Sequence, residues 1–567
     1  MDILGDEPDL DAEIAQARAD IAAGAIIEAV DRLQTLIEVP IYDHRLHYAM
    51  AAALGAMGDA EGQASWLLDA QTFHALQAIS EQDGVDMGRF VSEPNYALQI
   101  GEQAYADGRM GLASAAFGQV APQPGAPFNV ILRWGLSLLH QGRIPETLAA
   151  FTLAADTYHS SMAHEFLLYA CFFAPDGVHL HAAEARRWAQ LYAPTYDPAD
   201  RPFANPDLAD RKLRIGYVAP NLLRSQLKQF IVPVLETHDL DQLDVFIYCA
   251  DPTTEIGIRA TAVRGIGTLS DVDAASLIAS DGIDILVDLW GHTAGGRLGV
   301  FGLKPAPIQA AWINYVQTTG LPAMDYVLHA DGTKAPDDDA LFVEEIWRLG
   351  PIAVPFRPGE RLDPTPTPAL KTGHVTFASF NHPARLNDAT VAAWAAILKG
   401  RAGSKLLLKY RFFVDPVLQQ AVLARFLGHG VTAEQIVFEG HSTGPDYLKS
   451  FGRIDLALDP SPAPGGTTSS EAVSNGVPLL TLRGPDFYSR IGTLRLEPLG
   501  LHQLVAESWE DYVAKALALT EDLAALDALR AEIRPRFEAS PLRDEAGFTR
   551  ILEDALRQMF ERWKAGG

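Results

Sequence analysis

A proline-rich turn followed by two glycines and two threonines is the strongest chemical signal in this sequence. Residues 459–482 read DPSPAPGGTTSSEAVSNGVPLLTL and lie between two apolar, strand-like runs. Gly465 and Gly466 let the backbone approach a ligand closely, and Thr467 and Thr468 open a helix-like run. Because the first N–H groups of a helix lack internal partners and its dipole favours negative charge, we expect a diphosphate to bind at this corner.

The same stretch also has a purely structural interpretation. Residues 468–471 read TSSE, the pattern of a capping box in which Thr468 caps the helix and Glu471 reaches back to it. Under the ligand interpretation, the Glu471 carboxylate instead accepts hydrogen bonds from ribose hydroxyls. Two glycines directly before the cap, at the end of a strand, favour a phosphate site over capping alone.

Two further stretches supply candidate cations. Residues 379–387 read SFNHPARLN and place Asn381, His382 and Arg385 just after a strand-like run. The Arg385 guanidinium could neutralise charge on a leaving diphosphate, or it could simply cap a surface loop. Lys409 ends another strand-like run and is a second candidate, although a lysine that only snorkels to the surface is the commoner case.

A histidine lies in a glycine-rich loop that reads WGHTAGGRL at residues 290–298. A lone histidine is usually structural, but one in a glycine-rich loop after a strand can contact a ligand or transfer a proton. His292 is therefore our candidate for ligand contact or proton transfer.

Strand-like runs alternate with helix-like runs from about residue 212 onward. One series is LRIGYVAP, LDVFIYCAD, IDILVDLWG and APIQAAWINY, and a second is HVTFASFN, SKLLLKYRF, QIVFEG, IDLALDPS and GVPLLTLRG. The alternation predicts two doubly wound parallel sheets, with residues 357–372 as a hinge and helices from about 508 to 564 closing the chain. Ligands of such sheets bind at the carboxyl ends of the strands, where the loops described above lie.

Residues 1 to about 195 read as helices rich in Ala and Leu, and a spacing of 34 residues recurs among their glycines. A large apolar residue follows nine positions after each glycine. The pairs are Gly24 with Leu33, Gly58 with Leu67, Gly108 with Phe117, and Gly142 with Phe151. This period is typical of tetratricopeptide-like helix pairs, and a generic helical bundle is the alternative. We expect a partner-binding scaffold here, followed by a Pro- and Asp-rich linker over 192–214.

Composition limits the class of protein. The 567 residues are too many for one core, and a net charge of −27 disfavours general nucleic-acid binding. Cys171 and Cys249 lie in apolar runs without metal-type Cys/His spacing, which suits a reducing compartment. The acidic start is unlike a signal peptide, and no apolar run approaches the ~18 residues of a membrane span. We expect a cytoplasmic protein.

Residues 212–564 resemble glycosyltransferase family 41, the O-linked N-acetylglucosamine transferases and their bacterial relatives, which include transferases that glycosylate adhesins or flagellins. The similar segments are LRIGYVAP, DILVDLWGHTAGGRLGVFGLKPAPIQAAWINY, TTGLPAMDYVL, FASFN, IDLALDP and GGTTSSEAVSNGVPLLTLRG. The resemblance implies a type B glycosyltransferase fold of two Rossmann-like domains. It also implies transfer of a sugar from a nucleotide diphosphate to a protein side chain, with inversion and without a metal or other cofactor.

The resemblance also assigns roles to individual residues. Thr467 and Thr468 match the diphosphate-binding threonines and Glu471 the ribose-binding acid, while Arg385 stands where the family has a diphosphate-binding lysine and Tyr447 near the residue that packs on the base. Two stretches depart from the family. The loop after the first strand, APNLLRS, has Ser225 in place of a histidine, and residues 315–320 read YVQTTG instead of a Y-P-G-T-S/T-G motif. An arginine in place of lysine keeps the charge but changes the geometry.

We therefore predict a helical repeat domain over 1–195, an N-terminal Rossmann-like half over 212–360 and a C-terminal donor-binding half over 372–567. The predicted function is transfer of a sugar to protein from a UDP-sugar such as UDP-GlcNAc or UDP-glucose, with the helical repeats presenting the polypeptide acceptor. The alternatives are an activated nonulosonic acid as donor, a small acceptor, or a catalytically silent relative that only binds partners.

Overall fold

The structure is a computed structural model that describes residues 10–37, 44–58, 85–196, 203, 205–336 and 338–566. By compactness the chain divides into two units. The first is Met1–Gln141 with Arg411–Gly428, and the second is Gly142–Tyr410 with His429–Gly567.

The first unit is helical. Its helices are α1 (Leu10–Ala22), α2 (Ile26–Ile37), α3 (His44–Met57), α5 (Met87–Ser92), α6 (Pro94–Ala106), α7 (Met110–Gly118), α8 (Phe128–Gln141) and α18 (Pro416–Gly428). Gly24, Gly58 and Gly108 end helices with φ of 81°, 80° and 77°, a conformation that glycine adopts without strain. Leu33 and Phe117 are fully buried, as the 34-residue spacing predicts, whereas Leu67 lies outside the described residues.

Three more helices of the predicted repeat region belong to the second unit: α9 (Ile144–Tyr158), α10 (Ser161–Cys171) and α11 (Gly177–Tyr192). Close approaches at two glycines explain why. A Cβ on Gly142 would lie 3.0 Å from the carbonyl oxygen of Pro383, and one on Gly320 would overlap the Ala185 backbone. Helix α11 ends at Tyr192 and the first strand begins at Leu213, whereas the boundary between the compact units lies at residues 141–142.

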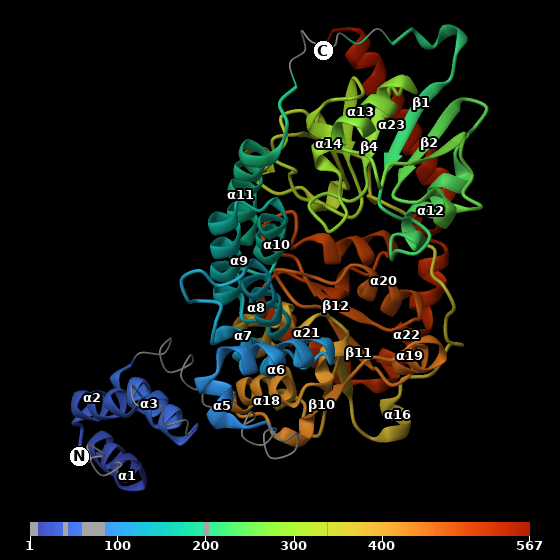
Figure 1. Ribbon diagram of the computed structural model, residues 1–567. Coiled ribbons are helices and arrows are strands. Elements are labelled where there is room, and N and C mark those ends of the chain that lie inside the picture. Colours follow the sequence, from blue (N-terminus) through green and yellow to red (C-terminus); the bar gives the residue numbers. More distant parts are fainter. Residues whose placement is uncertain are drawn as a thin grey trace. The chain divides into compact units, whose positions relative to one another are not determined.

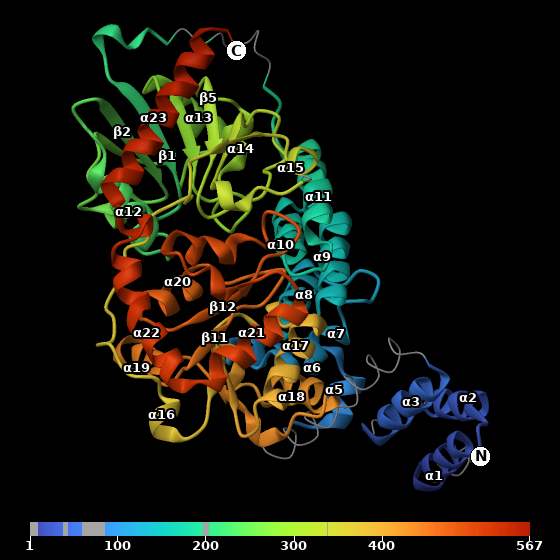
Figure 2. The ribbon, with the colours of Figure 1, turned by 180° about the vertical axis from the view of Figure 1, so that it is seen from behind.

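Two parallel sheets follow, as the sequence predicts (Figures 1 and 2). The first has the order β3-β2-β1-β4-β5-β6-β7. Its strands are β1 (Leu213–Val218), β2 (Leu243–Cys249), β3 (Ala262–Gly265), β4 (Ile285–Asp288), β5 (Ile308–Ala311), β6 (Tyr326–His329) and β7 (Glu345–Arg348). In register, Ile215 of β1 faces Val245 of β2 and Ile285 of β4.

The second sheet has the order β10-β9-β8-β11-β12-β13. Its strands are β8 (Thr376–Ser379), β9 (Lys405–Lys409), β10 (Ile436–Glu439), β11 (Leu456–Leu458), β12 (Leu479–Leu482) and β13 (Val505–Ala506). β11 pairs with both β8 and β12, so the loops that follow β8 and β11 leave the sheet side by side. The fold prediction, a helical region followed by two Rossmann-like halves, is confirmed.

Helices cover both faces of these sheets. They are α12 (Lys228–Thr237), α13 (Asp271–Ser280), α14 (Leu298–Gly302), α15 (Asp338–Leu341), α16 (Ala369–Thr372), α17 (Asp388–Gly400), α19 (Gly444–Phe451), α20 (Thr467–Ser474), α21 (Trp509–Glu521), α22 (Leu523–Glu538) and α23 (Glu545–Lys564). Ser270 caps α13 by accepting a hydrogen bond from the Asp273 N–H.

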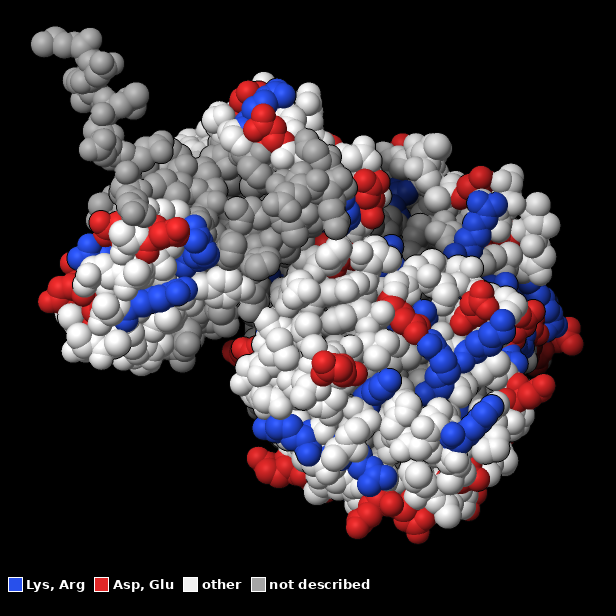
Figure 3. Space-filling model, turned by 90° about the horizontal axis from the view of Figure 1, so that it is seen from below, with Lys and Arg blue, Asp and Glu red and all other residues white. Residues whose placement is uncertain are grey.

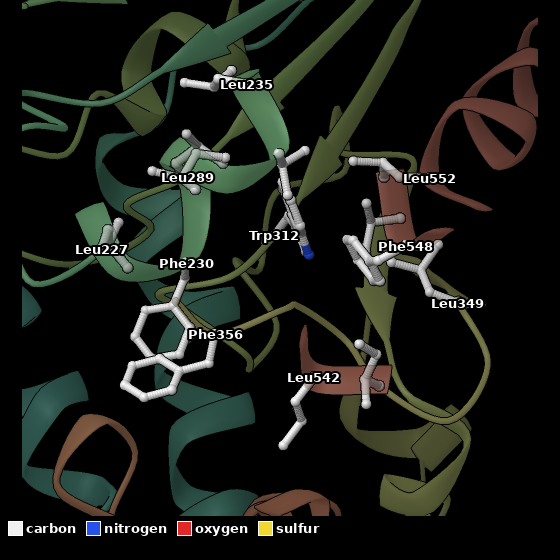
Figure 4. Packing of buried hydrophobic residues seen from close by; sticks show 14 of the residues in the cluster. Leu227, Phe230, Leu235, Leu289, Trp312, Leu349, Phe356, Leu542, Phe548 and Leu552 are labelled. Atoms are coloured by element: carbon white, nitrogen blue, oxygen red, sulfur yellow. The ribbon is translucent and has the colours of Figure 1, made fainter. Parts of the chain in front are cut away.

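The last helix, α23, returns to the first sheet (Figures 1 and 2). Figure 4 shows Phe548 of α23 beside Trp312, the residue that follows β5. Their ring centroids are 6.1 Å apart with an interplanar angle of 14°, and Phe356 of the inter-sheet segment packs on Phe230 at 5.0 Å. The two halves are therefore joined through one shared apolar cluster.

Among the helices that the structure describes, none has both the length and the apolar character needed to cross a bilayer.

Candidate active site

The predicted anion corner is the N-terminus of α20, which begins at Thr467 with Gly466 as its N-cap. No side chain caps this helix, so the predicted capping box at 468–471 is wrong. Within the described residues, the N–H groups of Thr467 and Thr468 have no acceptor and their hydroxyls form no hydrogen bond. The corner therefore presents two backbone donors, two hydroxyls and the positive end of a helix dipole.

A buried carboxylate that the sequence analysis missed shapes this corner. Asp459 is fully buried and accepts hydrogen bonds from the Gly465 N–H (2.7 Å), the Ser469 hydroxyl (3.0 Å) and the Thr481 hydroxyl (3.1 Å). Burial raises the pKa of Asp459 to about 6 against the opposing effect of these donors. The signal in the sequence was an Asp directly after an apolar strand and before the turn. Asp459 thus fixes the start of the glycine pair relative to β12 and α20.

The two glycines have different roles, which gives a matched pair of variants. A Cβ on Gly465 would overlap the Ser469 hydroxyl and crowd Asn381 and Asp459, whereas a Cβ on Gly466 would have no atom within 4 Å. We expect Gly465→Ala to lower the free energy of unfolding by about 1–3 kcal/mol. Gly466→Ala should leave the thermal stability of the nucleotide-free protein unchanged.

The same pair tests the ligand interpretation. If a diphosphate contacts the backbone here, Gly466→Ala should weaken nucleotide affinity in calorimetry although it leaves stability intact. Equal stability losses in both variants would contradict the different roles assigned to the two glycines.

Arg385 reaches the same turn from the loop after β8. Its Nη1 donates hydrogen bonds to the carbonyl oxygens of Ala463 (2.8 Å) and Pro464, and its guanidinium carbon lies 5.7 Å from the centroid of the Phe173 ring. The side chain is half-buried. The structure therefore brings Arg385 to the corner predicted to hold the diphosphate, with one face of the guanidinium on an aromatic ring.

Tyr447 and Glu471 lie together, as a shared nucleoside site requires. The Tyr447 hydroxyl donates to Glu471 Oε2 at 2.6 Å, and both side chains line a cavity of ≈ 260 Å³. Burial raises the pKa of the Glu471 carboxyl, and the Tyr447 hydrogen bond opposes this effect. The cavity thus has an aromatic wall and a carboxylate.

Sequence reasoning missed the wall of this cavity that comes from the first half. Gln229 of α12 and residues 358–360 of the inter-sheet segment line it opposite α19 and α20. The side-chain oxygen of Gln229 is buried and has no hydrogen-bond partner within the described part of the chain. An amide that faces a cavity without a partner is a candidate ligand contact.

Three other predicted donor-binding residues are engaged within the protein. Asn381 donates to the Ser379 hydroxyl (3.1 Å) and lies near Gly465, so it belongs to the corner. His382 Nδ1 accepts the Ala384 N–H (2.9 Å), and its ring packs on Phe173 and Tyr410, so it supports the Arg385 loop. Lys409 Nζ pairs with Glu439 at 3.2 Å, which neutralises the charge that the donor role required.

His292 is not at an open edge of the sheet. It is only 1% exposed, its Nε2 donates to the carbonyl oxygen of Thr319 at 2.8 Å, and its ring packs edge-on against Trp188 and Tyr315. Burial lowers its pKa to about 3. The prediction that His292 is an accessible general base is contradicted by this burial, because helix α11 covers the loop.

With this geometry in view, comparison with known proteins decides the family. The sequence profile described as Glycosyl transferase family 41 matches residues 192–346 and 367–552, more than half of the chain. The chain belongs to this family.

Two curated relatives of this family 41 chain are named as peptide N-acetylglucosaminyltransferases. A Hordeum vulgare protein named "Probable UDP-N-acetylglucosamine--peptide N-acetylglucosaminyltransferase SPINDLY" is 34% identical over 397 residues, which are 68% of this chain and 42% of that protein. A Caenorhabditis elegans UDP-N-acetylglucosamine--peptide N-acetylglucosaminyltransferase is 22% identical over 480 residues, covering 63% of this chain and 41% of that protein. The chain spans less than half the length of these curated relatives.

Among solved structures, a mutant Thermobaculum terrenum O-GlcNAc transferase is similar over nearly the whole chain. Its TM-score is 0.75 and its identity 29%, with 91% of this chain and 97% of that chain covered. The helical region followed by two parallel sheets is thus the arrangement of a type B glycosyltransferase of family 41 with its helical repeats.

One position in this family 41 chain bears directly on proton transfer. Ser225 stands where the resemblance places a histidine, and its hydroxyl donates to the carbonyl oxygen of Leu222 at 3.0 Å. A serine hydroxyl that is bound to its own turn is a far weaker base than an imidazole, and it lacks the unprotonated ring nitrogen that accepts a proton. Neither Ser225 nor His292 is therefore available as a general base.

Proposed function

We propose that this chain is a glycosyltransferase that moves a sugar from a UDP-sugar to a protein side chain. The observation that carries the proposal is the uncapped N-terminus of α20 with Arg385 beside it, an arrangement that suits a diphosphate. Family membership and the names of the relatives support a nucleotide-sugar donor, with UDP-GlcNAc and UDP-glucose as the first donors to test.

In this proposal the diphosphate lies at Thr467 and Thr468, and the nucleoside extends into the cavity lined by Tyr447, Glu471 and Gln229. Tyr447 offers an aromatic face to the base, and Glu471 offers a carboxylate oxygen to the ribose hydroxyls. Since the cavity has walls from both halves, nucleotide binding should also hold the halves together.

Catalysis in this proposal acts mainly on the leaving group. As the bond between the sugar and the diphosphate breaks, negative charge develops on the diphosphate, and Arg385 and the N–H groups of α20 stabilise it. The acceptor attacks from the opposite face of the sugar, so the reaction inverts the anomeric centre. We propose that these groups serve without a metal ion or other cofactor, so that chelator leaves transfer unchanged.

The acceptor is proposed to be a polypeptide held by the helical repeats in the cytoplasm. Repeats of this kind form extended concave surfaces that suit an unfolded chain. Figure 3 shows acidic and basic side chains interspersed on the face of the molecule that is seen from below.

The diphosphate site is tested by the double variant Thr467→Ala/Thr468→Ala. We expect it to weaken UDP binding by on the order of 2–4 kcal/mol in calorimetry, because two hydrogen bonds to a charged group are lost. Thermal stability without nucleotide should not change, since neither hydroxyl caps the helix.

Ser508→Ala is the control for this prediction. Ser508 caps α21 by accepting the Asp511 N–H, so its loss should lower stability and leave UDP affinity intact. Unchanged UDP affinity in the double threonine variant would remove the diphosphate from α20 and contradict the proposed function.

A further inference from the structure

The loop that carries Arg385 is contacted by turns of the helical region. This loop follows β8, and its short 3₁₀ helix spans Pro383–Arg385. Both ribbon views show α10 next to the second sheet (Figures 1 and 2). Two turns from much earlier in the chain touch the loop, one at Gly142 between α8 and α9 and one at Phe173 after α10.

Phe173 lies against the Arg385 guanidinium. The guanidinium carbon is 5.7 Å from the centroid of the Phe173 ring, a distance at which the negative face of the ring attracts a cation. The same ring stacks on His382 with centroids 6.1 Å apart and an interplanar angle of 22°. His382 Nδ1 accepts the Ala384 N–H, so one aromatic ring contacts both the cation and the residue that supports its loop.

The hydrogen bonds from Arg385 to the turn before α20 do not fix its orientation by themselves. Both use Nη1, which donates to the carbonyl oxygens of Ala463 and Pro464. A planar group anchored through one nitrogen can still pivot about that atom, and a flat ring against its face limits the pivot. Orientation matters here, because a cation lowers the barrier only where charge develops on the leaving group.

Phe173 is itself held in place. It is 2% exposed, and Tyr169 packs on it edge-on with ring centroids 5.2 Å apart. The turn after α10 is tightly closed, since a Cβ on Gly177 would lie 1.8 Å from the Cys171 carbonyl oxygen. Because both the backbone and the ring of Phe173 are constrained, the ring is a fixed support for Arg385.

The turn at Gly142 contacts the same loop through its backbone. Gly142 has a φ of 78°, and a Cβ on it would lie 3.0 Å from the Pro383 carbonyl oxygen and 3.5 Å from the Ala384 Cα. A backbone carbonyl at that distance can give way only if the loop moves. The position of the Arg385 loop therefore depends on two turns of the helical region.

We propose that Phe173 is a positioning residue for the transfer reaction, which together with the Gly142 turn holds the Arg385 guanidinium where the diphosphate leaves, an inference that rests on the proposed function. Phe173 acts only through Arg385 in this arrangement. The helical region then has a second role besides holding the acceptor, because two of its turns support the cation that assists the leaving group.

The first measurement is kcat of the full chain at saturating UDP-GlcNAc or UDP-glucose, with a Ser/Thr-rich peptide as acceptor, per folded molecule. We expect Phe173→Leu to lower kcat by ~10–100-fold, because a cation displaced from its productive position assists departure poorly. UDP affinity in calorimetry should stay within about threefold, since the loss falls on the transition state. Phe151→Leu is the control, because Phe151 is a fully buried ring of α9 that stacks on Phe166 at 5.6 Å. It should lower the unfolding temperature and keep kcat.

A double-mutant cycle shows whether Phe173 acts through Arg385. If it does, Phe173→Leu has little left to remove once the guanidinium is gone. We therefore expect it to change kcat by less than about twofold in an Arg385→Met background. A merely structural role would give the same loss of kcat in both backgrounds.

Gly142→Ala and Gly108→Ala separate the second contact from backbone strain. The two glycines have φ of 78° and 77°, so alanine strains both turns alike. The nearest heavy atom to a Cβ on Gly108 is Phe412 Cδ1, at an ordinary contact distance of 3.9 Å. Both variants should lower the unfolding temperature, and only Gly142→Ala should also lower kcat.

The outcomes are distinct. Wild-type kcat in Phe173→Leu, or a loss that persists in full in the Arg385→Met background, overturns the positioning role and leaves the proposed function standing. A wild-type chain that transfers sugar from neither donor overturns the proposed function, and the positioning role with it.

Discussion

Arg385→Met is expected to lower kcat by about 10²–10³-fold at saturating donor, while UDP affinity falls much less. The guanidinium is fixed beside α20 by hydrogen bonds to the carbonyl oxygens of Ala463 and Pro464 and by the Phe173 ring. It is therefore already in place when charge develops on the leaving diphosphate, which is where a cation lowers the barrier most. Single-turnover rates with UDP-GlcNAc or UDP-glucose measure the effect.

Arg385→Lys is the matched control. A lysine keeps the charge but cannot bond both carbonyl groups in the same plane, so its rate should lie between those of wild type and Arg385→Met. Thermal unfolding of each variant separates a loosened turn from lost catalysis. Equal kcat in wild type and Arg385→Met would show that α20 alone stabilises the leaving group.

The fold was predictable where local patterns and tertiary structure agree. Gly24, Gly58 and Gly108 end helices in the left-handed conformation that their spacing predicted. Long apolar runs became β1, β2, β8 and β9, because buried parallel strands need such runs. Strands β3, β6, β7 and β13 were missed. Three of them are edge strands, and no long apolar run marks any of the four.

The site was predictable only in part, because its precise form depends on contacts between distant segments. Arg385 reaches residues 463–464 through the pairing of β8 with β11, which the loop positions suggested. The capping box failed because the helix begins at Thr467, one residue before the expected cap, and Glu471 bonds to Tyr447 instead. Gln229 lines a cavity that is formed jointly by α12, α19 and α20. No local sequence pattern predicts that these distant helices come together.

The last prediction concerns His292, where sequence and structure lead to opposite expectations. A glycine-rich loop after a strand suggested a general base, whose loss would slow transfer at least ~100-fold. The structure gives a buried ring that donates to Thr319 and fills the space between Trp188 and Tyr315. His292→Ala should therefore lower the free energy of unfolding by about 2–4 kcal/mol, through a cavity and an unpaired carbonyl oxygen.

The rate per folded molecule should stay within a few-fold of wild type. His292→Gln is the informative comparison variant, because its amide can still donate to Thr319 and should recover part of the stability.

The pH dependence of the stability provides a second measurement. Burial lowers the His292 pKa from 6.5 to about 3, so between these values the unfolded chain binds the extra proton and the native state loses stability as pH falls. His292→Gln should lose less stability over that window. A large rate loss in this variant with stability intact would restore His292 as the base.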